Sequence, residues 1–142
     1  MEIFVFRKVG QEFTRRLRAL DNVVIVYIVD GELVSSVSDL ITLWFMTILI
    51  QSKFEVPVVP IINKIDKSRN VELFDIIVEN PSRLKNVINS LEKELLADIA
   101  SDVLLIIEKV SQSLRPVKVS ALKKVGLEKL HTLLYCACGD LT

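Results

Sequence analysis

Residues 56–66 read VPVVPIINKID, an apolar run that ends in a group of polar side chains. The part from Pro57 to Ile62 has the length and apolar character of a strand buried inside a parallel sheet. Asn63, Lys64 and Asp66 follow it directly. Open α/β sheets bind ligands beyond the carboxyl ends of their strands. The stretch therefore predicts a buried strand and, at its end, a binding site.

The rest of the chain alternates helical and strand patterns around this stretch. The predicted strands are 23–29, expected to be buried on both faces, 57–62 and the short 115–119. The predicted helices are 2–20, one capped by Ser35, Ser36 or Ser38 and ending near Lys53, then 71–78, 81–97, 98–113 and 125–136. This order indicates an α/β fold with a parallel sheet. With no repeat or linker, residues 1–142 are expected to form a single domain.

The spacing Asn63-Lys64-x-Asp66 suits recognition of a guanine base. An Asp carboxylate can accept hydrogen bonds from both N1–H and the 2-amino group of guanine, a pair of donors that adenine does not offer. The Asn amide can contact the major-groove edge of the base, and the Lys stem can lie over its face. The alternative is an ordinary turn between strand and helix, capped by Asp66 or Ser68.

A second candidate element is Ser120-Ala121-Leu122, which follows the third predicted strand. Parallel strands place their carboxyl ends at one edge, so this element is expected near Asn63. There the backbone N–H of Ala121 can donate to the base. The alternative for Ser120 is a helix cap.

Composition limits the classes of function. The 142 residues carry 18 basic and 18 acidic side chains, so a strongly basic nucleic-acid surface is not expected. Hydrophobic residues make up 51% of the chain, with a mean hydropathy of +0.44, which favours self-association. The longest apolar stretch, Leu40–Ile50, is about half of the ~20 residues that span a bilayer. No signal peptide is recognisable, and we expect a cytoplasmic protein without a membrane segment.

Several other residues have a structural interpretation beside a chemical one. Asp30, before Gly31, is expected to be a turn residue rather than a metal or catalytic carboxylate. Cys136 and Cys138 are expected to be buried or frayed thiols rather than zinc ligands with His131. Arg15, Arg16 and Arg18 are expected to form a solvated helix end. A core or subunit contact is expected for Trp44, Phe45 and Met46.

With these residues in view, the chain resembles the C-terminal part of a GPN-loop GTPase. The similarity is carried by four stretches: 1–10, 27–30 with the Ser-rich cap that follows, the approach to Asn63-Lys64-x-Asp66, and the tail 136–142. The resemblance implies a partial P-loop-NTPase-like domain with three α/β/α layers, a mainly parallel sheet and a helical insertion at 67–115.

The chain departs from that family at its phosphate-binding parts. No G-x-x-x-x-G-K-[ST] loop is present, nor is the Gly-Pro-Asn loop or the Asp-Thr-Pro-Gly stretch. Those parts supply the phosphate and Mg²⁺ ligands. We therefore expect a partial GTPase-like domain that starts after them, contains no catalytic residues and does not hydrolyse GTP alone.

The resemblance also implies ligands and partners. These are GTP or GDP with Mg²⁺, a second copy or a complementing polypeptide, and an association with RNA polymerase assembly. The alternative is a non-catalytic interaction module or fragment. Such a module would associate through apolar helices and through the open sheet edge at residues 23–29.

Overall fold

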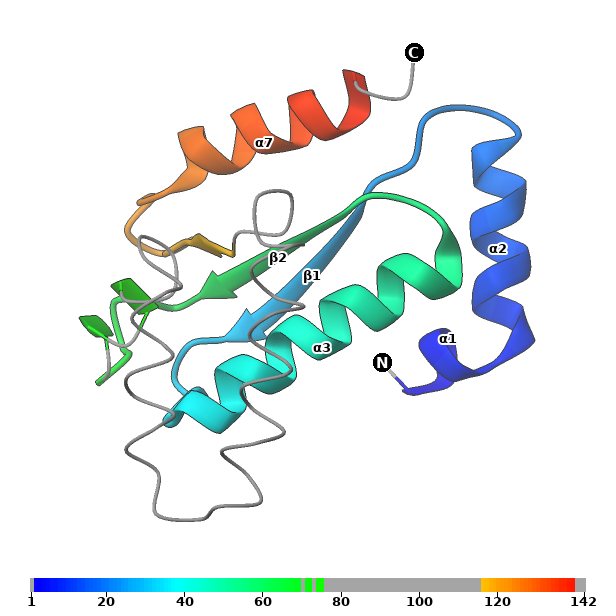
Figure 1. Ribbon diagram of the computed structural model, residues 1–142. Helices are drawn as coiled ribbons and strands as arrows, with labels where there is room; N and C mark the ends of the chain where they lie inside the picture. The colour runs from blue at the N-terminus through cyan, green and yellow to red at the C-terminus, as the bar shows by residue number, and fades with distance from the viewer. Residues whose placement is uncertain (1, 70, 73, 76–115, 140–142) are drawn as a thin grey trace.

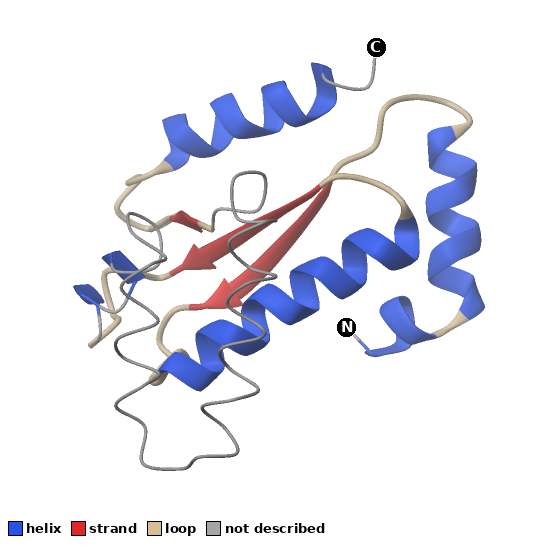
Figure 2. Cartoon of the chain, in the orientation of Figure 1, coloured by secondary structure: helices blue, strands red, loops and turns tan. Residues whose placement is uncertain are grey.

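The computed structural model describes residues 2–69, 71, 72, 74, 75 and 116–139. In this part of the chain, a three-stranded parallel sheet in the order β1-β2-β3 lies between helices on its two faces (Figures 1 and 2). The strands are β1 (Ile25–Asp30), β2 (Val58–Asn63) and β3 (Val117–Lys118). The principal helices are α1 (Glu2–Phe6), α2 (Lys8–Arg18), α3 (Val37–Phe54) and α7 (Leu127–Gly139). The described residues of the predicted helix 71–78 are helical; the helices predicted at 81–97 and 98–113 lie outside the described residues.

β2 is the central strand of the sheet, and it is buried as its sequence predicts. It pairs with β1 in the register Ile25↔Val58 to Asp30↔Asn63, and with β3 at Ile61↔Val117. Its first five residues are all buried. Because all three strands run in the same direction, the residues that follow them meet at one edge of the sheet.

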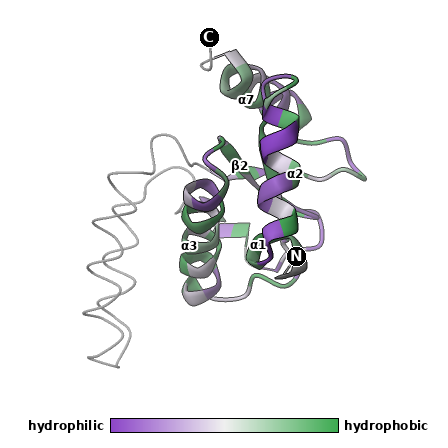
Figure 3. Ribbon diagram, turned by 90° about the vertical axis from the view of Figure 1, so that its right-hand side faces the viewer, coloured by the Kyte–Doolittle hydropathy of each residue, from purple (hydrophilic) through white to green (hydrophobic). Residues whose placement is uncertain are grey.

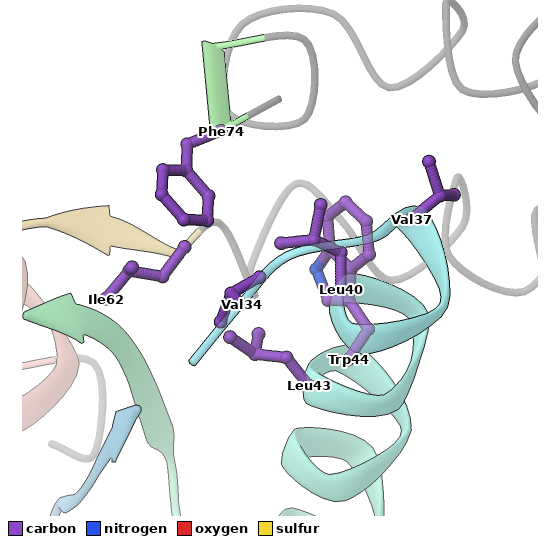
Figure 4. Packing of buried hydrophobic residues seen from close by; sticks show 7 residues of the cluster. All are labelled: Val34, Val37, Leu40, Leu43, Trp44, Ile62 and Phe74. Atoms are coloured by element: carbon purple, nitrogen blue, oxygen red, sulfur yellow. The ribbon is translucent and has the colours of Figure 1, made fainter. Parts of the chain in front are cut away.

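α3 covers one face of the sheet and supplies most of its core. Leu40, Leu43 and Trp44 of this helix pack with Ile62 of β2 and with Phe74 (Figure 4). Of the residues expected in the core or in a subunit contact, Trp44 is a core residue at 2% exposure, whereas Phe45 is 42% exposed.

α7 covers the opposite face. Leu130, Leu133 and Leu134 pack against a cluster formed by β2, β3 and the residue after β3: Val59, Ile61, Val117 and Val119. The sheet therefore lies between two helical layers, and the predicted three-layer α/β/α arrangement is confirmed (Figure 3).

The single helix predicted at 2–20 is in fact two helices that meet at Arg7. Arg7 has an extended backbone with φ −101° and ψ 152°. The bend buries Val5 at 3% exposure and stacks Phe4 on Phe54, with ring centroids 5.5 Å apart. Gly10 permits the bend, because a Cβ there would lie 1.9 Å from the carbonyl oxygen of Phe4.

The prediction that β1 is buried on both faces is wrong. The face carrying Ile25, Tyr27 and Val29 packs towards α3, but Val26 is 37% exposed and Ile28 is 61% exposed on the other face. α7 lies over β2 and β3, and no element within the described residues covers these two side chains.

α3 is long and apolar enough to cross a membrane by length and composition alone, with 18 residues and a hydropathy of 1.2. A core helix of a folded domain meets the same criterion, and α3 packs on the sheet with 39% of its residues buried.

α3 begins with a capping box at Ser36, one of the three predicted caps. The Ser36 hydroxyl accepts from the Asp39 N–H, and the Asp39 carboxylate accepts from the N–H groups of Ser35 and Ser36, each at 2.9 Å. These bonds satisfy backbone donors that a helix start leaves open. They hold the pKa of Asp39 below its usual value near 3.8, the Ser35 N–H contributing most.

We predict that Asp39→Ala lowers the free energy of unfolding by about 1 kcal/mol at neutral pH. Because the folded-state pKa of Asp39 is depressed, its contribution is present above pH ~4 and is lost as the pH falls through the folded value. Urea unfolding at neutral pH and near pH 3 measures both effects. Ser38→Ala, one position along the same turn, is the matched control. Equal stability of Asp39→Ala and the wild type at neutral pH would contradict the prediction.

Candidate functional site

The candidate site lies at the edge where the three strands end. Asn63 is the last residue of β2, and Lys64 follows in the left-handed region with φ 59°. This conformation is uncommon for a residue other than glycine, and it turns the chain sharply out of the sheet. The N–H of Ile65 then donates to the carbonyl of Val119 at 3.3 Å, which joins the loop after β2 to the loop after β3.

The loop after β3 is closed on itself. Ser120 and Val125 form an antiparallel bridge, with backbone bonds of 3.0 and 3.1 Å in the two directions. Gly126 follows with φ 77°, and a Cβ at this position would lie 2.0 Å from the carbonyl oxygen of Lys118. The position therefore requires glycine for both its backbone conformation and its close approach to β3. The closed loop presents Ala121 and Leu122 at its tip.

Two hydrogen bonds join the predicted elements. The N–H of Ala121 donates to Asn63 Oδ1 at 3.2 Å. The hydroxyl of Ser120, which is 1% exposed, donates to Asp66 Oδ1 and accepts from the N–H of Lys123 at 3.1 Å. The structure thus brings together four predicted site residues from segments more than 50 residues apart. The Ser120 hydroxyl closes a turn at Lys123 and does not cap α7, which begins at Leu127, so the helix-cap alternative is wrong.

The environment of Asp66 favours its ionised form. The Ser120 hydroxyl is the main reason that its pKa lies below the usual value, and the positive charges of Lys123 and Lys67 act in the same direction. The carboxylate is therefore an acceptor at neutral pH.

Lys64 forms an ion pair with Asp30, the last residue of β1. Asp30 also accepts from the N–H of Glu32 at 3.0 Å, which confirms the predicted turn role. The bond to Lys64 lowers the pKa of Asp30, and it raises that of Lys64. These two residues are 34 positions apart, and the one sequence signal for their pairing is that Asp30 ends a strand parallel to β2.

Leu122, the remaining predicted residue, is 79% exposed at the tip of its loop. Cys136 and Cys138 are exposed free thiols. Arg15 and Arg16 pair with Glu12 on the surface of α2.

The described residues do not fit a Mg²⁺ site. No group of three or more His, Cys, Asp or Glu side chains gathers among them. Asp30, the carboxylate at the end of β1, is bonded to Lys64 and to the Glu32 N–H. No chemical step through a metal follows from this geometry.

A parallel sheet between two helical layers, with polar loops that meet at its carboxyl edge, is the architecture of a partial P-loop-NTPase-like α/β fold, and sheets of this kind bind ligands at that edge. The comparisons with known proteins agree. Residues 1–139 match the model of a family described as "Conserved hypothetical ATP binding protein". The chain belongs to this family.

The chain is also similar to GPN-loop GTPase PAB0955 of Pyrococcus abyssi, at 30% identity over the whole chain and 58% of that protein. The crystal structure of that GTPase in its apo form superposes with a TM-score of 0.79 and 26% identity, covering 95% of this chain and 54% of the other. The resemblance to GPN-loop GTPases is thus confirmed. The chain spans little more than half the length of this relative.

We predict that Ser120→Ala raises the pKa of Asp66 towards its usual value, because the hydroxyl that stabilises the carboxylate is removed. Carboxyl-carbon NMR titration measures this shift. Glu12, which pairs with Arg15 and Arg16 on the surface of α2, serves as the reference in the same spectra. An Asp66 titration that is identical in the variant and the wild type would show that the two side chains do not interact.

Proposed function

We propose that this edge of the sheet binds a guanine nucleotide through its base. The observation that carries the proposal is the meeting of the two loops, where Ala121 bonds to Asn63 and Ser120 bonds to Asp66. The spacing Asn63-Lys64-x-Asp66 supplies the acceptor for guanine, and the fold puts the second loop beside it. Membership of a nucleotide-binding family supports the same conclusion.

Asp66 is the residue that we assign to the guanine edge. An ionised carboxylate has about four lone-pair sites, so one bond from Ser120 leaves capacity for N1–H and the 2-amino group. The depressed pKa keeps Asp66 ionised for this role. Adenine has no matching pair of donors, so the proposal favours guanine although the family description names ATP.

Asn63 and Ala121 are assigned to the opposite edge of the base. Because Asn63 Oδ1 accepts from Ala121, its Nδ2 group is the part that can donate to the base. The N–H of Ala121 can turn to the guanine carbonyl only by sharing or giving up its bond to Asn63. Binding therefore exchanges the hydrogen bond between Ala121 and Asn63 for hydrogen bonds to the base. The stem of Lys64 would lie over one face of the base, and Leu122, at the loop tip, would lie beside the base.

We propose that this chain by itself binds the nucleotide without hydrolysing it. The sequence has no phosphate-binding loop, and the described residues do not fit a Mg²⁺ site. A nucleoside and its diphosphate should consequently bind with similar affinity, since the base provides most of the contacts.

We predict that Asp66→Asn weakens GDP binding at least about 10-fold and gains affinity for xanthosine diphosphate, whose base offers an acceptor where guanine has its amino group. Calorimetric titration with GDP, xanthosine diphosphate and ADP measures the preference. Asp21→Asn makes the same change in charge far from the site and should retain the wild-type preference. Binding of GDP and ADP with equal affinity by the wild-type chain would refute base recognition.

A second candidate function is docking onto another polypeptide, either a second copy or a partner such as the RNA polymerase assembly machinery that the resemblance implies. The observation in its favour is the apolar face of β1, where Val26 and Ile28 are exposed. β1 has a strand neighbour on one side only within the described residues. An apolar strand with an open edge is prone to pair with other chains.

We predict that Ile28→Lys reduces self-association of the chain at tens of micromolar, because a charge on this face opposes its burial. Sedimentation velocity measures the distribution of species. Leu33→Lys introduces the same charge at another apolar side chain, 76% exposed in the loop after β1, and is the matched control. A wild-type chain that is already a uniform monomer would remove self-association as a function.

A further inference from the structure

Asp30 and Asn63 occupy matching positions at the ends of two paired strands. The register aligns them directly, and the N–H of Gly31 donates to the carbonyl of Asn63 at 2.7 Å. A Cβ on Gly31 would lie 2.8 Å from that carbonyl oxygen and 3.1 Å from Ile62 Cγ2. Glycine thus permits this close contact, which places the Asp30 carboxylate at a defined distance from the chain that carries Lys64.

The Asp30 carboxylate is itself held in place. One oxygen accepts from the N–H of Glu32 at 3.0 Å, and the other accepts from the Lys64 ammonium. The first bond orients the carboxylate through its own turn. The bond to the Lys64 ammonium is therefore made by a carboxylate that is already oriented.

Lys64 is consequently restrained at both ends. Its backbone is set by the strand pair and by the left-handed turn, and its ammonium is set by Asp30. The aliphatic stem runs between these two points, while 48% of the side chain remains exposed. A free lysine on a surface samples many rotamers, and ordering it on binding reduces affinity.

We propose that Asp30 is a positioning residue of the guanine site: it holds the Lys64 ammonium so that the lysine stem is laid out for the base before the nucleotide arrives. This inference rests on the proposed function. Asp30 does not touch the base; it acts through Lys64. Removing Asp30 should weaken binding of the base while leaving the choice between guanine and xanthine, which depends on Asp66, unchanged.

The test is a double-mutant cycle on GDP binding, measured by calorimetry with the full chain. Asp30→Asn keeps an oxygen for the Glu32 N–H but removes the ion pair, and we expect it to weaken binding about 3- to 10-fold. Lys64→Met keeps an apolar stem without the charge. In that background Asp30→Asn should have no further effect, because no ammonium remains to be positioned.

Asp21→Asn is the control for net charge and should bind GDP as the wild type does. The proposal is overturned if Asp30→Asn binds GDP as tightly as the wild type. It is also overturned if Asp30→Asn weakens GDP binding by the same factor in the Lys64→Met variant as in the wild type. A merely structural role for Asp30 would produce the second of these results, since it would not depend on the lysine.

A ligand-free measurement separates this inference from the proposed function. Carboxyl-carbon NMR should show that the pKa of Asp30 lies below its usual value in the wild type and rises towards that value in Lys64→Met, while the Glu32 N–H still bonds to the carboxylate. If the wild type binds no guanine nucleotide, both the proposed function and the positioning role for the base fail, even where this titration shows that the pair exists. If GDP binds but the titration is insensitive to Lys64→Met, the proposed function stands and the positioning role fails.

Discussion

The parallel pairing of β2 with β1 and β3 is the constraint on which the rest of the structure depends. β2 is buried because strands flank it on both sides and helices cover both faces. Since all three strands run the same way, Asp30, Asn63 and Ser120 arrive at one edge although they are far apart in the chain. The polar cluster at that edge follows from the direction of the strands, and the helices contribute by burying the apolar side chains behind it.

At this edge, the side chains that we assign to the base already have partners within the protein. Asn63 bonds to Ala121, Asp66 to Ser120, and Lys64 to Asp30. Each bond holds one side chain against a residue of a neighbouring strand or loop. The internal bonds therefore keep the site in shape without a ligand. They also set a condition on any ligand, which must offer replacement bonds in the same places.

The apolar surfaces lie apart from this edge. On β1, Val26 and Ile28 are exposed beside an open strand edge. On α2, the apolar side chains of Val9, Phe13 and Leu17 are exposed, and Leu20 just beyond the helix is exposed too. The buried side of α2 instead uses the small residues Gly10 and Thr14. A protein contact through these surfaces and a nucleotide at the carboxyl edge would not compete for the same atoms, so the two candidate functions are compatible.

The sequence by itself determined the buried strand β2, a serine cap for α3 and the two loops of the candidate site. Each of these depends on residues close together in the chain: an apolar run of strand length, a capping box, or polar residues directly after a strand. Only the tertiary structure decided the bend at Arg7, the exposure of Val26 and Ile28, and the pairing of Asp30 with Lys64, which are 34 positions apart. Burial and charge pairing depend on which elements become neighbours in the fold. A local sequence pattern does not specify how far α7 covers the sheet or what lies beside β1.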